Sequence, residues 1–494
     1  MLHVDTVQCS VTGLGAELAV HRFALTVALN SVPVITLECT PVAAQGVGIH
    51  CHAPDFAEIT SLFQTLLARV PKYDAHGTVD IDITVNGESN AQHVTLTDWV
   101  LTDVGLSTVT PIASPVLVVV LSHPVTMLDK TGTLYENPES PLAVESVFSS
   151  VDGEDTVSIM DSVYNGFAND LDYHLVANLA QGGSDEQAIA IVKAFRNMLT
   201  TYPPGKYMKG TGGMFLAQQA PGLDKEIRAT IAEMTGPRPF CDSTWGRLVS
   251  SICPSLMQQV TPTYEEDKLM LEPSEPWVSP TLTVKSNLVT AVDVPPRDPN
   301  PIIGVAVHRA DSIRDEAHMA AVRNGVLSDR SYAFYFPPKV KPGDLGRVLN
   351  IDDSPVIMTI LGKAEGKNEN HGAAAGNTME DAYDPLSDDY YGKMTRAYAQ
   401  AMFQSCYRKD CQARVLMTPV FTDANGTMLH PGRVIEVRDS ESDAVLLEGQ
   451  LLQLSVTGSM DGQAETSMLL GYVRPHDSSV CLVPDGTMNP CYSS

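Results

Sequence analysis

The glycine-rich stretch from Gly205 to Gly213 holds the residue types of a phosphate-binding loop. It contains two lysines and four glycines. Glycine lets the backbone approach a phosphate closely, and lysine supplies positive charge. The order G-x-x-x-x-G-K-[ST] is absent, however, and no strand is predicted to lead into the stretch. We therefore expect a flexible loop here, and we expect neither a cofactor nor a cofactor-binding residue.

The tripeptide His50-Cys51-His52 offers imidazole and thiol groups, which are ligands that zinc prefers. In an extended chain the two imidazoles would lie on one side and the thiol on the other. Asp55 is the only further ligand nearby, so a polar strand edge is the simpler interpretation. Cys406 and Cys411 have no matching second pair after them, which argues against a zinc site there. We expect no metal-binding residue.

Hydrolytic chemistry would need a nucleophile or paired carboxylates. The G-x-S-x-G motif is absent, and nothing in the sequence singles out a Cys with a His partner. Glu226, Glu233 and Asp242 could pair for cell-wall cleavage, but acidic residues at helix starts and on solvated faces explain them equally well. Trp245 and Trp277 fit core or interface anchors better than sugar platforms. We therefore expect no catalytic residue and a protein that is not an enzyme.

Composition bounds the class of protein. The 494 residues leave room for about two to four domains, and 44% are hydrophobic and 18% charged, as in globular proteins. The formal net charge is −27, from 59 acidic and 32 basic residues. This balance opposes nonspecific binding to nucleic acid or anionic lipid, and it also favours general solubility.

Cysteine use and hydropathy predict a protein that folds in a cytoplasm. The nine cysteines are an odd number without a paired spacing pattern, so we expect buried thiols rather than disulfides. The first residues lack the basic and apolar regions of a signal peptide. The longest apolar run, Pro115–Leu121, is far below the roughly 20 residues of a membrane span. We therefore expect no membrane insertion by this chain itself.

Periodicity predicts a mainly β protein of the α+β class. Residues 56–70 carry a helical apolar stripe, and Val79–Val85 alternates strictly before a hairpin turn at Asn86-Gly87. From about residue 151 the sequence pattern predicts capped helices, and after residue 262 it again predicts strands. The expected domains are residues 1–150 (β-rich), 151–262 (a helical insertion), 263–362 (a second β-rich domain), 363–384 (a flexible loop), 385–475 (a helix plus a C-terminal β-barrel) and 476–494 (an extended tail).

The stretch from Ser387 to Pro475 predicts a helix packed on a small antiparallel β-barrel. Ser387 is a good N-cap, and apolar residues then recur every three or four positions. Strand-like runs follow from residue 413, separated by turns at Asp423-Ala-Asn-Gly426 and Asp439–Asp443.

Residue parity predicts which side chains fill this barrel. Ile435 and Val437 share one face of their strand and are expected in the interior, opposite Leu452 and Leu454 of the next strand. Glu436 is then expected to point outward, toward solvent or a neighbouring subunit.

The run Met428-Leu-His-Pro-Gly432-Arg-Val-Ile-Glu-Val437 places a Pro-Gly turn and a short β segment between a helix–strand unit and the closing strands. This layout resembles the baseplate hub proteins of tailed bacteriophages, and it is similar to the hub-like half of type VI secretion spike proteins. The resemblance covers about half of the chain, in β-barrel domains of hub type.

The resemblance implies a homotrimer whose paired β-barrel domains form a ring. The ring would join the tail tube to the spike or tail-tip proteins, contact other baseplate proteins, and let DNA only pass through its lumen. Such a protein is made in the host cytoplasm and ends in the baseplate of the virion tail. Two alternatives stay open: a tail-tip receptor-binding or adhesin module, which would also be acidic and β-rich, and a cell-wall hydrolase built on the helical block.

Overall fold

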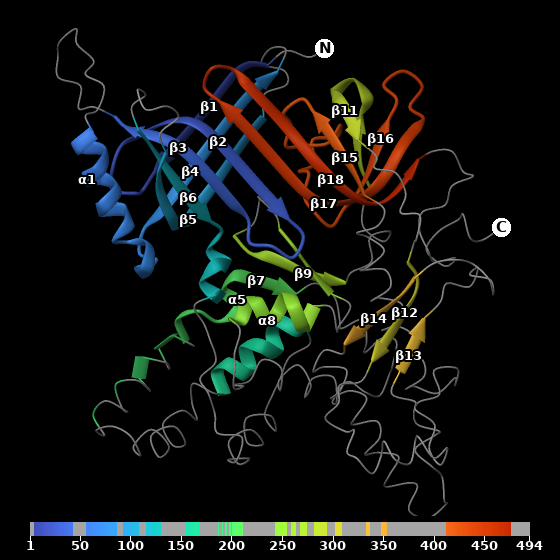
Figure 1. Ribbon diagram of the computed structural model, residues 1–494, viewed down its shortest axis with the longest axis horizontal. Coiled ribbons are helices and arrows are strands. Elements are labelled where there is room, and N and C mark those ends of the chain that lie inside the picture. The colour runs from blue at the N-terminus through green and yellow to red at the C-terminus, as the bar shows by residue number, and fades with distance from the viewer. Residues whose placement is uncertain are drawn as a thin grey trace, which may run out of the picture.

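Twelve strands of the described residues form one sheet, and the other elements are arranged around it (Figure 1). The computed structural model describes residues 4–42, 56–85, 92–107, 115–129, 155–166, 201–210, 243–253, 258–262, 267–273, 281–293, 302–308, 332–335, 347–352 and 412–475, with isolated positions between 186 and 200. The predicted helix after Ser387, the flexible loop 363–384 and the tail 476–494 lie outside the described residues.

The first six strands of the chain close into a ring. They are β1 (Val4–Thr12), β2 (Leu18–Ala28), β3 (Val34–Pro41), β4 (His76–Val85), β5 (Gln92–Ser107) and β6 (Val116–Ser122). Neighbours in the order β1-β4-β5-β6-β3-β2 pair antiparallel, and β1 also pairs with β2. The last pairing completes the ring, so these strands satisfy one another's backbone hydrogen bonds.

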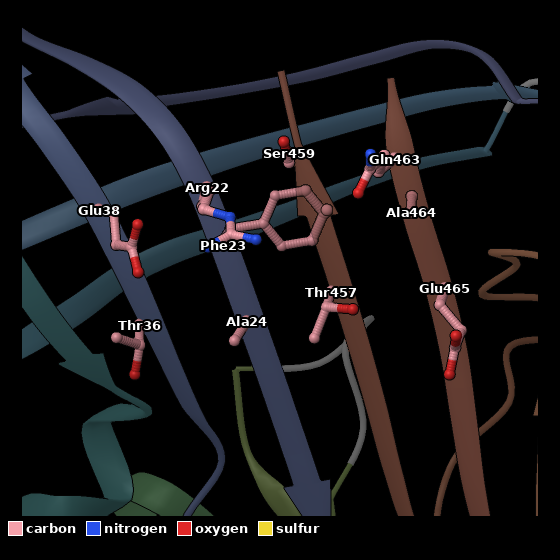
Figure 2. Close-up of a pocket in the computed structure, with 11 residues that line it drawn as sticks. Arg22, Phe23, Ala24, Thr36, Glu38, Thr457, Ser459, Gln463, Ala464 and Glu465 are labelled. Atoms are coloured by element: carbon pink, nitrogen blue, oxygen red, sulfur yellow. The ribbon is translucent and has the colours of Figure 1, made fainter. Parts of the chain in front are cut away.

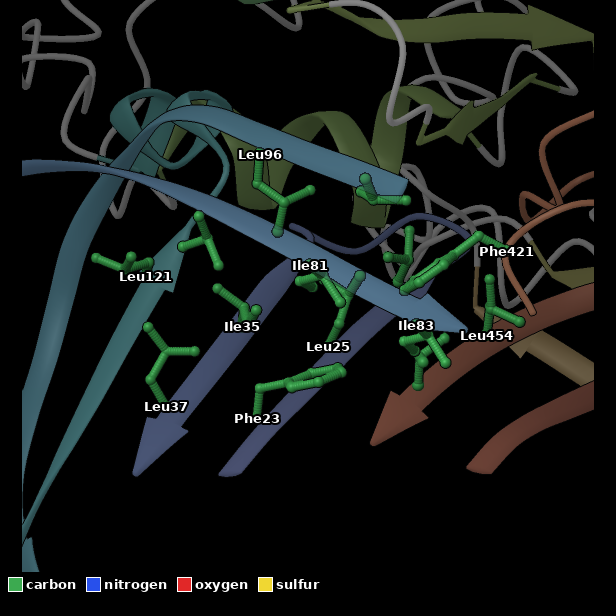
Figure 3. Packing of buried hydrophobic residues seen from close by; sticks show 14 of the residues in the cluster. Phe23, Leu25, Ile35, Leu37, Ile81, Ile83, Leu96, Leu121, Phe421 and Leu454 are labelled. Carbon is green, nitrogen blue, oxygen red and sulfur yellow. The ribbon is translucent and has the colours of Figure 1, made fainter. Parts of the chain in front are cut away.

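The core of the ring follows from strict alternation along its strands. On β4, Ile81 and Ile83 are fully buried, while Asp82 between them points to the outer face. The strand predicted over residues 79–85 is therefore confirmed. The same cluster of buried side chains extends to Phe421 and Leu454 from the C-terminal part of the chain (Figure 3). One continuous core thus connects the two ends of the sequence.

Helix α1 (Phe56–Leu67) packs against β3, β5 and β6 at one end of the ring. Ile59 and Leu66 on its apolar face are at most 1% exposed and belong to the main core, which confirms the predicted helical stripe. Short 3-10 turns η1 (Val70–Lys72) and η3 (Pro124–Asp129) follow α1 and β6.

Six further strands complete the large sheet. They are β10 (Thr281–Lys285), β11 (Val289–Asp293), β15 (Gln412–Met417), β16 (Val434–Arg438), β17 (Val445–Ser459) and β18 (Gln463–Pro475), with a 3-10 turn η5 (Ser286–Leu288) between the first two. The long strand β17 pairs with β18 along its length, with β16 through its first half and with β2 through its second half. The mainly β class is confirmed, and β17 is the strand that joins both halves.

The predicted parity of β16 is confirmed. Ile435 and Val437 are at most 3% exposed and lie in the main core, where Leu454 is also fully buried. Glu436 points to the opposite face, where its side chain is 18% exposed and its Oε2 accepts a hydrogen bond of 2.7 Å from Arg438 Nε.

The predicted partners of Ile435 and Val437 are wrong, because Ile435 lies opposite Gly449 and Val437 opposite Leu447. Leu454 is buried as predicted but is not opposite β16, and Leu452 is not in the core. The register between β17 and β18 shifts between Leu451 and Gln453, which marks a β-bulge. Leu451 is fully buried as a result, and Leu452 is only half-buried. The carbonyl of Leu452 instead accepts a hydrogen bond of 2.8 Å from the backbone N–H of Leu29, at the end of β2.

The pairing of β17 with β2 requires a glycine at position 458. Gly458 lies opposite Phe23, whose buried ring covers it. A Cβ at this position would lie 2.4 Å from the nearest ring carbon, so no other residue fits without moving the aromatic side chain.

A small sheet and short helices form a second core. The sheet contains β7 (Met208–Gly210), β9 (Leu269–Pro273) and β8 (Gln258–Thr261), in that order. It is accompanied by α5 (Pro204–Tyr207), α8 (Thr244–Arg247), the π-helical turn η4 (Leu248–Ile252) and helical residues 156–166. Trp245, Leu248 and Leu271 are among its buried residues.

Strand pairing crosses the predicted domain limits. β9 pairs with β7 and β8, and β10 and β11 pair with β16 and β15. The residues predicted as one β-rich domain, 263–362, thus contribute to different sheets. A third sheet contains β13 (Tyr332–Tyr335), β12 (Ile302–His308) and β14 (Arg347–Asp352). The domain limits themselves stay a prediction.

Candidate assembly surface

Most residues weighed for chemistry in the sequence lie outside the described residues. These are the tripeptide His50-Cys51-His52, Asp55, Glu226, Glu233, Asp242, Trp277, Cys406 and Cys411. Trp245 is described and is 8% exposed in the second core, which agrees with the predicted role of a core anchor.

The flexible loop predicted from Gly205 is wrong for residues 205–210, which form α5 and β7. The backbone N–H of Gly205 donates to Asp161 Oδ1 over 2.8 Å, and Lys268 Nζ donates to the Gly205 carbonyl over 2.5 Å. Burial raises the pKa of the Asp161 carboxyl above its ordinary value. Because the Asp161 carboxylate already accepts the hydrogen bond from the Gly205 N–H, this N–H is not available to bind a phosphate.

The described thiols are poor nucleophiles. Burial raises the pKa of Cys9 and of Cys39 to about 12, and it also raises the pKa of Cys253. Thiols with such values stay protonated at neutral pH, whereas catalysis and metal binding use the thiolate. This arrangement favours the predicted role of buried packing residues for Cys39 and Cys253, and Cys9 is half-buried against the main core.

The outer face of β4 and β5 carries a hydrogen-bond chain that sequence reasoning missed. His93 Nδ1 lies 2.7 Å from Asp82 Oδ1, and its Nε2 lies 3.1 Å from Thr95 Oγ1. The strand register brings these groups together, since Asp82 pairs with His93 and Asp80 pairs with Thr95. A carboxylate, an imidazole and a hydroxyl in this order are the connectivity of a catalytic triad.

The surroundings of this chain do not support nucleophilic catalysis. The Thr95 hydroxyl donates to Asp80 Oδ1 over 2.7 Å, so its proton is directed away from the imidazole that would have to accept it. The side chains of His93 and Asp82 are 60% and 54% exposed, and the neighbouring strand N–H groups pair within the sheet instead of forming an oxyanion hole. We interpret this row of hydrogen-bonded side chains as a surface network without a catalytic role.

The turn at Pro431-Gly432, which carries the resemblance, is held against the small sheet. Arg433 Nη1 donates to Glu272 Oε1 over 2.8 Å, and both side chains are less than a fifth exposed. The same oxygen accepts a hydrogen bond of 2.6 Å from Thr261 Oγ1. Gly432 has a φ of +93°, and a Cβ there would lie 2.8 Å from the Thr261 hydroxyl oxygen. This turn therefore fixes the position of the small sheet relative to β16.

An open hollow of about 460 Å³ lies over the strands that join the two halves, β3, β2, β17 and β18 (Figure 2). Arg22 and Glu38 are cross-strand neighbours on one side, and Glu465 stands on the other. Small side chains such as Ala24 and Thr457 lie between them. The charged and polar side chains that line the hollow can offer hydrogen bonds and ion pairs to a partner. It is a candidate contact surface.

Two kinds of feature are not found within the described part of the chain. There, no three or more His, Cys, Asp or Glu side chains are grouped so that they could hold a metal ion. None of the helices in these ranges combines the length and the apolar character that crossing a membrane requires.

Comparison with known sequences gives no relative, since neither a family model nor a curated protein matches the chain.

Comparison with solved structures gives phage tail and type VI secretion proteins. The tail protein from Neisseria meningitidis is 10% identical with a TM-score of 0.43, and the match covers 95% of this chain and 96% of that one. The 43 kDa tail protein of prophage MuSo2 from Shewanella oneidensis is 9% identical with a TM-score of 0.45, covering 94% and 97%. A component of the type VI secretion system from E. coli is 9% identical with a TM-score of 0.35, covering 97% and 79%.

Proposed function

We propose that this chain is a non-enzymatic structural protein of a bacteriophage tail, and that it serves as the baseplate hub. The observation that carries the proposal is the position of β17. This one strand pairs with β16 in the half that resembles hub proteins and with β2 in the N-terminal ring, over seven residue pairs from Gln453–Ala28 to Ser459–Arg22. A continuous sheet of this kind is a stiff platform and suits a load-bearing role.

The finer proposal is a homotrimeric ring. Each chain would supply two units of the hub type, with β1–β6 as an N-terminal β-barrel and β10, β11 and β15–β18 as a C-terminal one. Three chains would then place six such units around a lumen. A heterologous contact between copies closes into a ring when its rotation permits. The hollow over β3, β2, β17 and β18 lies across both units and is our choice for a contact with another subunit.

The expected partners are the tail tube protein on one face of the ring, the spike or tail-tip proteins on the other, and further baseplate proteins. DNA would only pass through the lumen. The formal net charge of −27 supports this part of the proposal, because a negative surface repels the phosphate backbone. The chain would reach the tail baseplate of the virion after synthesis in the host cytoplasm.

The oligomeric state of the purified protein is the first test. Mass photometry is expected to give a particle of three times the 53.2 kDa mass of the chain. The matched variants are Thr457→Arg, which places a large cation in the hollow, and Thr12→Arg, which places the same side chain on the exposed end of β1. We expect the first to weaken the trimer and the second to leave it intact. A monomer at micromolar concentration, or equal effects of both variants, would contradict the ring.

The location in the virion is the second test. Deletion of the gene from its phage is expected to give particles that lack a complete baseplate, and the restored protein should be detected at the tail end by antibody labelling. Zymography of the purified protein on cell wall is expected to show no lysis. Clear lysis that disappears in Glu226→Gln or Glu233→Gln would favour the hydrolase alternative. Labelling confined to fibres distal to the baseplate would favour the receptor-binding alternative.

A further inference from the structure

Two side-chain oxygens are buried where the small sheet meets β16 and β17. Gln259 on β8 and Gln450 on β17 are at most 1% exposed. Neither Oε1 atom accepts a hydrogen bond within the described residues. Buried polar groups in native proteins almost always have a hydrogen-bond partner, from the protein or from ordered water. The two oxygens therefore call for a donor.

Rotation of the amide groups does not supply this donor. Gln450 Nε2 donates to the Gly432 carbonyl over 3.2 Å, and Gln259 Nε2 donates to Glu272 Oε1 over 3.4 Å. If either amide were flipped, its oxygen would face another acceptor, which is repulsive. Both orientations are thus fixed by the acceptors that surround the nitrogen atoms, and both oxygens are left without a donor.

The charge balance of the junction decides what kind of donor fits. Glu272 forms an ion pair with Arg433 over 2.8 Å, so the two buried charges already compensate each other. His430 lies beside this pair, and burial lowers its pKa to about 4, which keeps it neutral near pH 7. A bound cation would add an uncompensated charge to a buried site beside a guanidinium. A neutral donor avoids this cost.

We propose that this junction binds ordered internal water, which donates protons to Gln259 Oε1 and to Gln450 Oε1. A buried water normally makes two to four hydrogen bonds to polar groups that otherwise lack partners, and each of these two oxygens is such a group. The site lies where β8 and β17, which are remote in sequence, both approach the turn that positions the small sheet. The proposal goes beyond the structural role and does not depend on it.

The direct test is an experimental structure at a resolution that shows ordered water. We expect a density peak for water within about 2.7–3.2 Å of each Oε1 atom. A protein donor on either oxygen, or a dry junction, would overturn the proposal.

The test in solution compares Gln450→Met with Gln453→Met. Gln453 is on the same strand but is only half-buried, and its amide already donates to Ser455 Oγ over 3.0 Å. Loss of the bound water and of the bond to Gly432 should raise the unfolding equilibrium constant of Gln450→Met about tenfold, and Gln453→Met should change it less. If no water is bound, Gln450→Met still loses the bond to Gly432 but also removes an unsatisfied acceptor. The two effects oppose each other, so the constant should change little, and that result would refute the inference.

A third measurement separates water from a cation. Melting of the wild-type protein is compared in NaCl, KCl and choline chloride at equal ionic strength. A water site predicts equal midpoints in the three salts. A midpoint that rises in one alkali salt, and does not rise in Gln450→Met, would assign the site to that cation instead.

Discussion

Replacement of Gly432 by alanine tests whether the Pro431-Gly432 turn is locked against the small sheet. The added Cβ would lie 2.8 Å from Thr261 Oγ1 and 3.2 Å from Gln259 Nε2. The Thr261 hydroxyl cannot retreat freely, because it donates to Glu272 Oε1 over 2.6 Å and Glu272 is itself held by Arg433. The substitution therefore combines backbone strain with a contact that the surrounding network resists.

We expect Gly432→Ala to lower the free energy of unfolding by about 2–5 kcal/mol. About 1–2 kcal/mol comes from holding a residue with a Cβ in the left-handed region, and about 1–3 kcal/mol comes from overpacking. Gly426→Ala is the matched control, since Gly426 has a φ of +81° but no atom within 4 Å of the position of a Cβ. It should show the first cost alone, about 1–2 kcal/mol.

Denaturant unfolding followed by tryptophan fluorescence measures both variants, and Trp245 in the second core reports on the small sheet. Thr261→Ala removes the two atoms of residue 261 that crowd the added Cβ, so Gly432→Ala together with Thr261→Ala should cost at least about 1 kcal/mol less than the sum of the single changes. Equal losses for Gly432→Ala and Gly426→Ala, or strict additivity in the double variant, would refute the locked turn.

Three further expectations concern the core. Gly458→Ala should lower the free energy of unfolding by about 1–3 kcal/mol through overlap with the aromatic ring beside it, and a loss near zero in a urea titration would contradict this. Ile435→Ala should cost about 2–5 kcal/mol, and Glu436→Ala markedly less; equal losses would show that the strand faces are misassigned. Burial lowers the pKa of His123 from 6.5 to about 4, so the unfolded chain binds a proton that the folded chain does not. Stability should therefore fall as pH drops from about 6.5 to 4, with roughly 3 kcal/mol of the loss from His123. His123→Gln should remove that share of the slope, and the share of His430, whose pKa burial also lowers to about 4, should remain.

The local periodicity of the sequence was sufficient to predict many of the strands and their buried faces. The alternation of Ile81 and Ile83 with aspartates has one consistent solution, a strand with one buried face, and the structure has that strand. The parity of Ile435 and Val437 is right for the same reason. The β-bulge that turns Leu451 into the core is different. It accompanies the contact between β17 and the end of β2, more than four hundred residues away in the chain, and no local pattern encodes that contact.

The hydrogen-bond network around His93 depends on the register between β4 and β5, which the residues of the predicted turn did not reveal. A two-residue turn at Asn86-Gly87 would pair Asp82 with position 91. The strands instead pair Asp82 with His93, which is two residues further along. A shift of two preserves the face of every side chain, so it leaves the predicted alternation intact while it changes which residues meet on the outer face. The alternation of residues determines which face of the sheet a side chain lies on, and the strand register determines which side chains it contacts.

The strand pairings show how the N-terminal ring and the C-terminal strands are joined into one sheet. All pairings of the N-terminal ring lie within residues 4–122, so the ring uses no strand from the rest of the chain. The C-terminal strands need β10 and β11, from residues 281–293, before their sheet is complete. The second half of β17 pairs with β2, and this contact joins residues more than four hundred positions apart in the chain. The hollow over β3, β2, β17 and β18 therefore exists only when both halves have folded and joined. A surface formed in this way would let a subunit of an assembly bind its neighbour only once its own fold is complete.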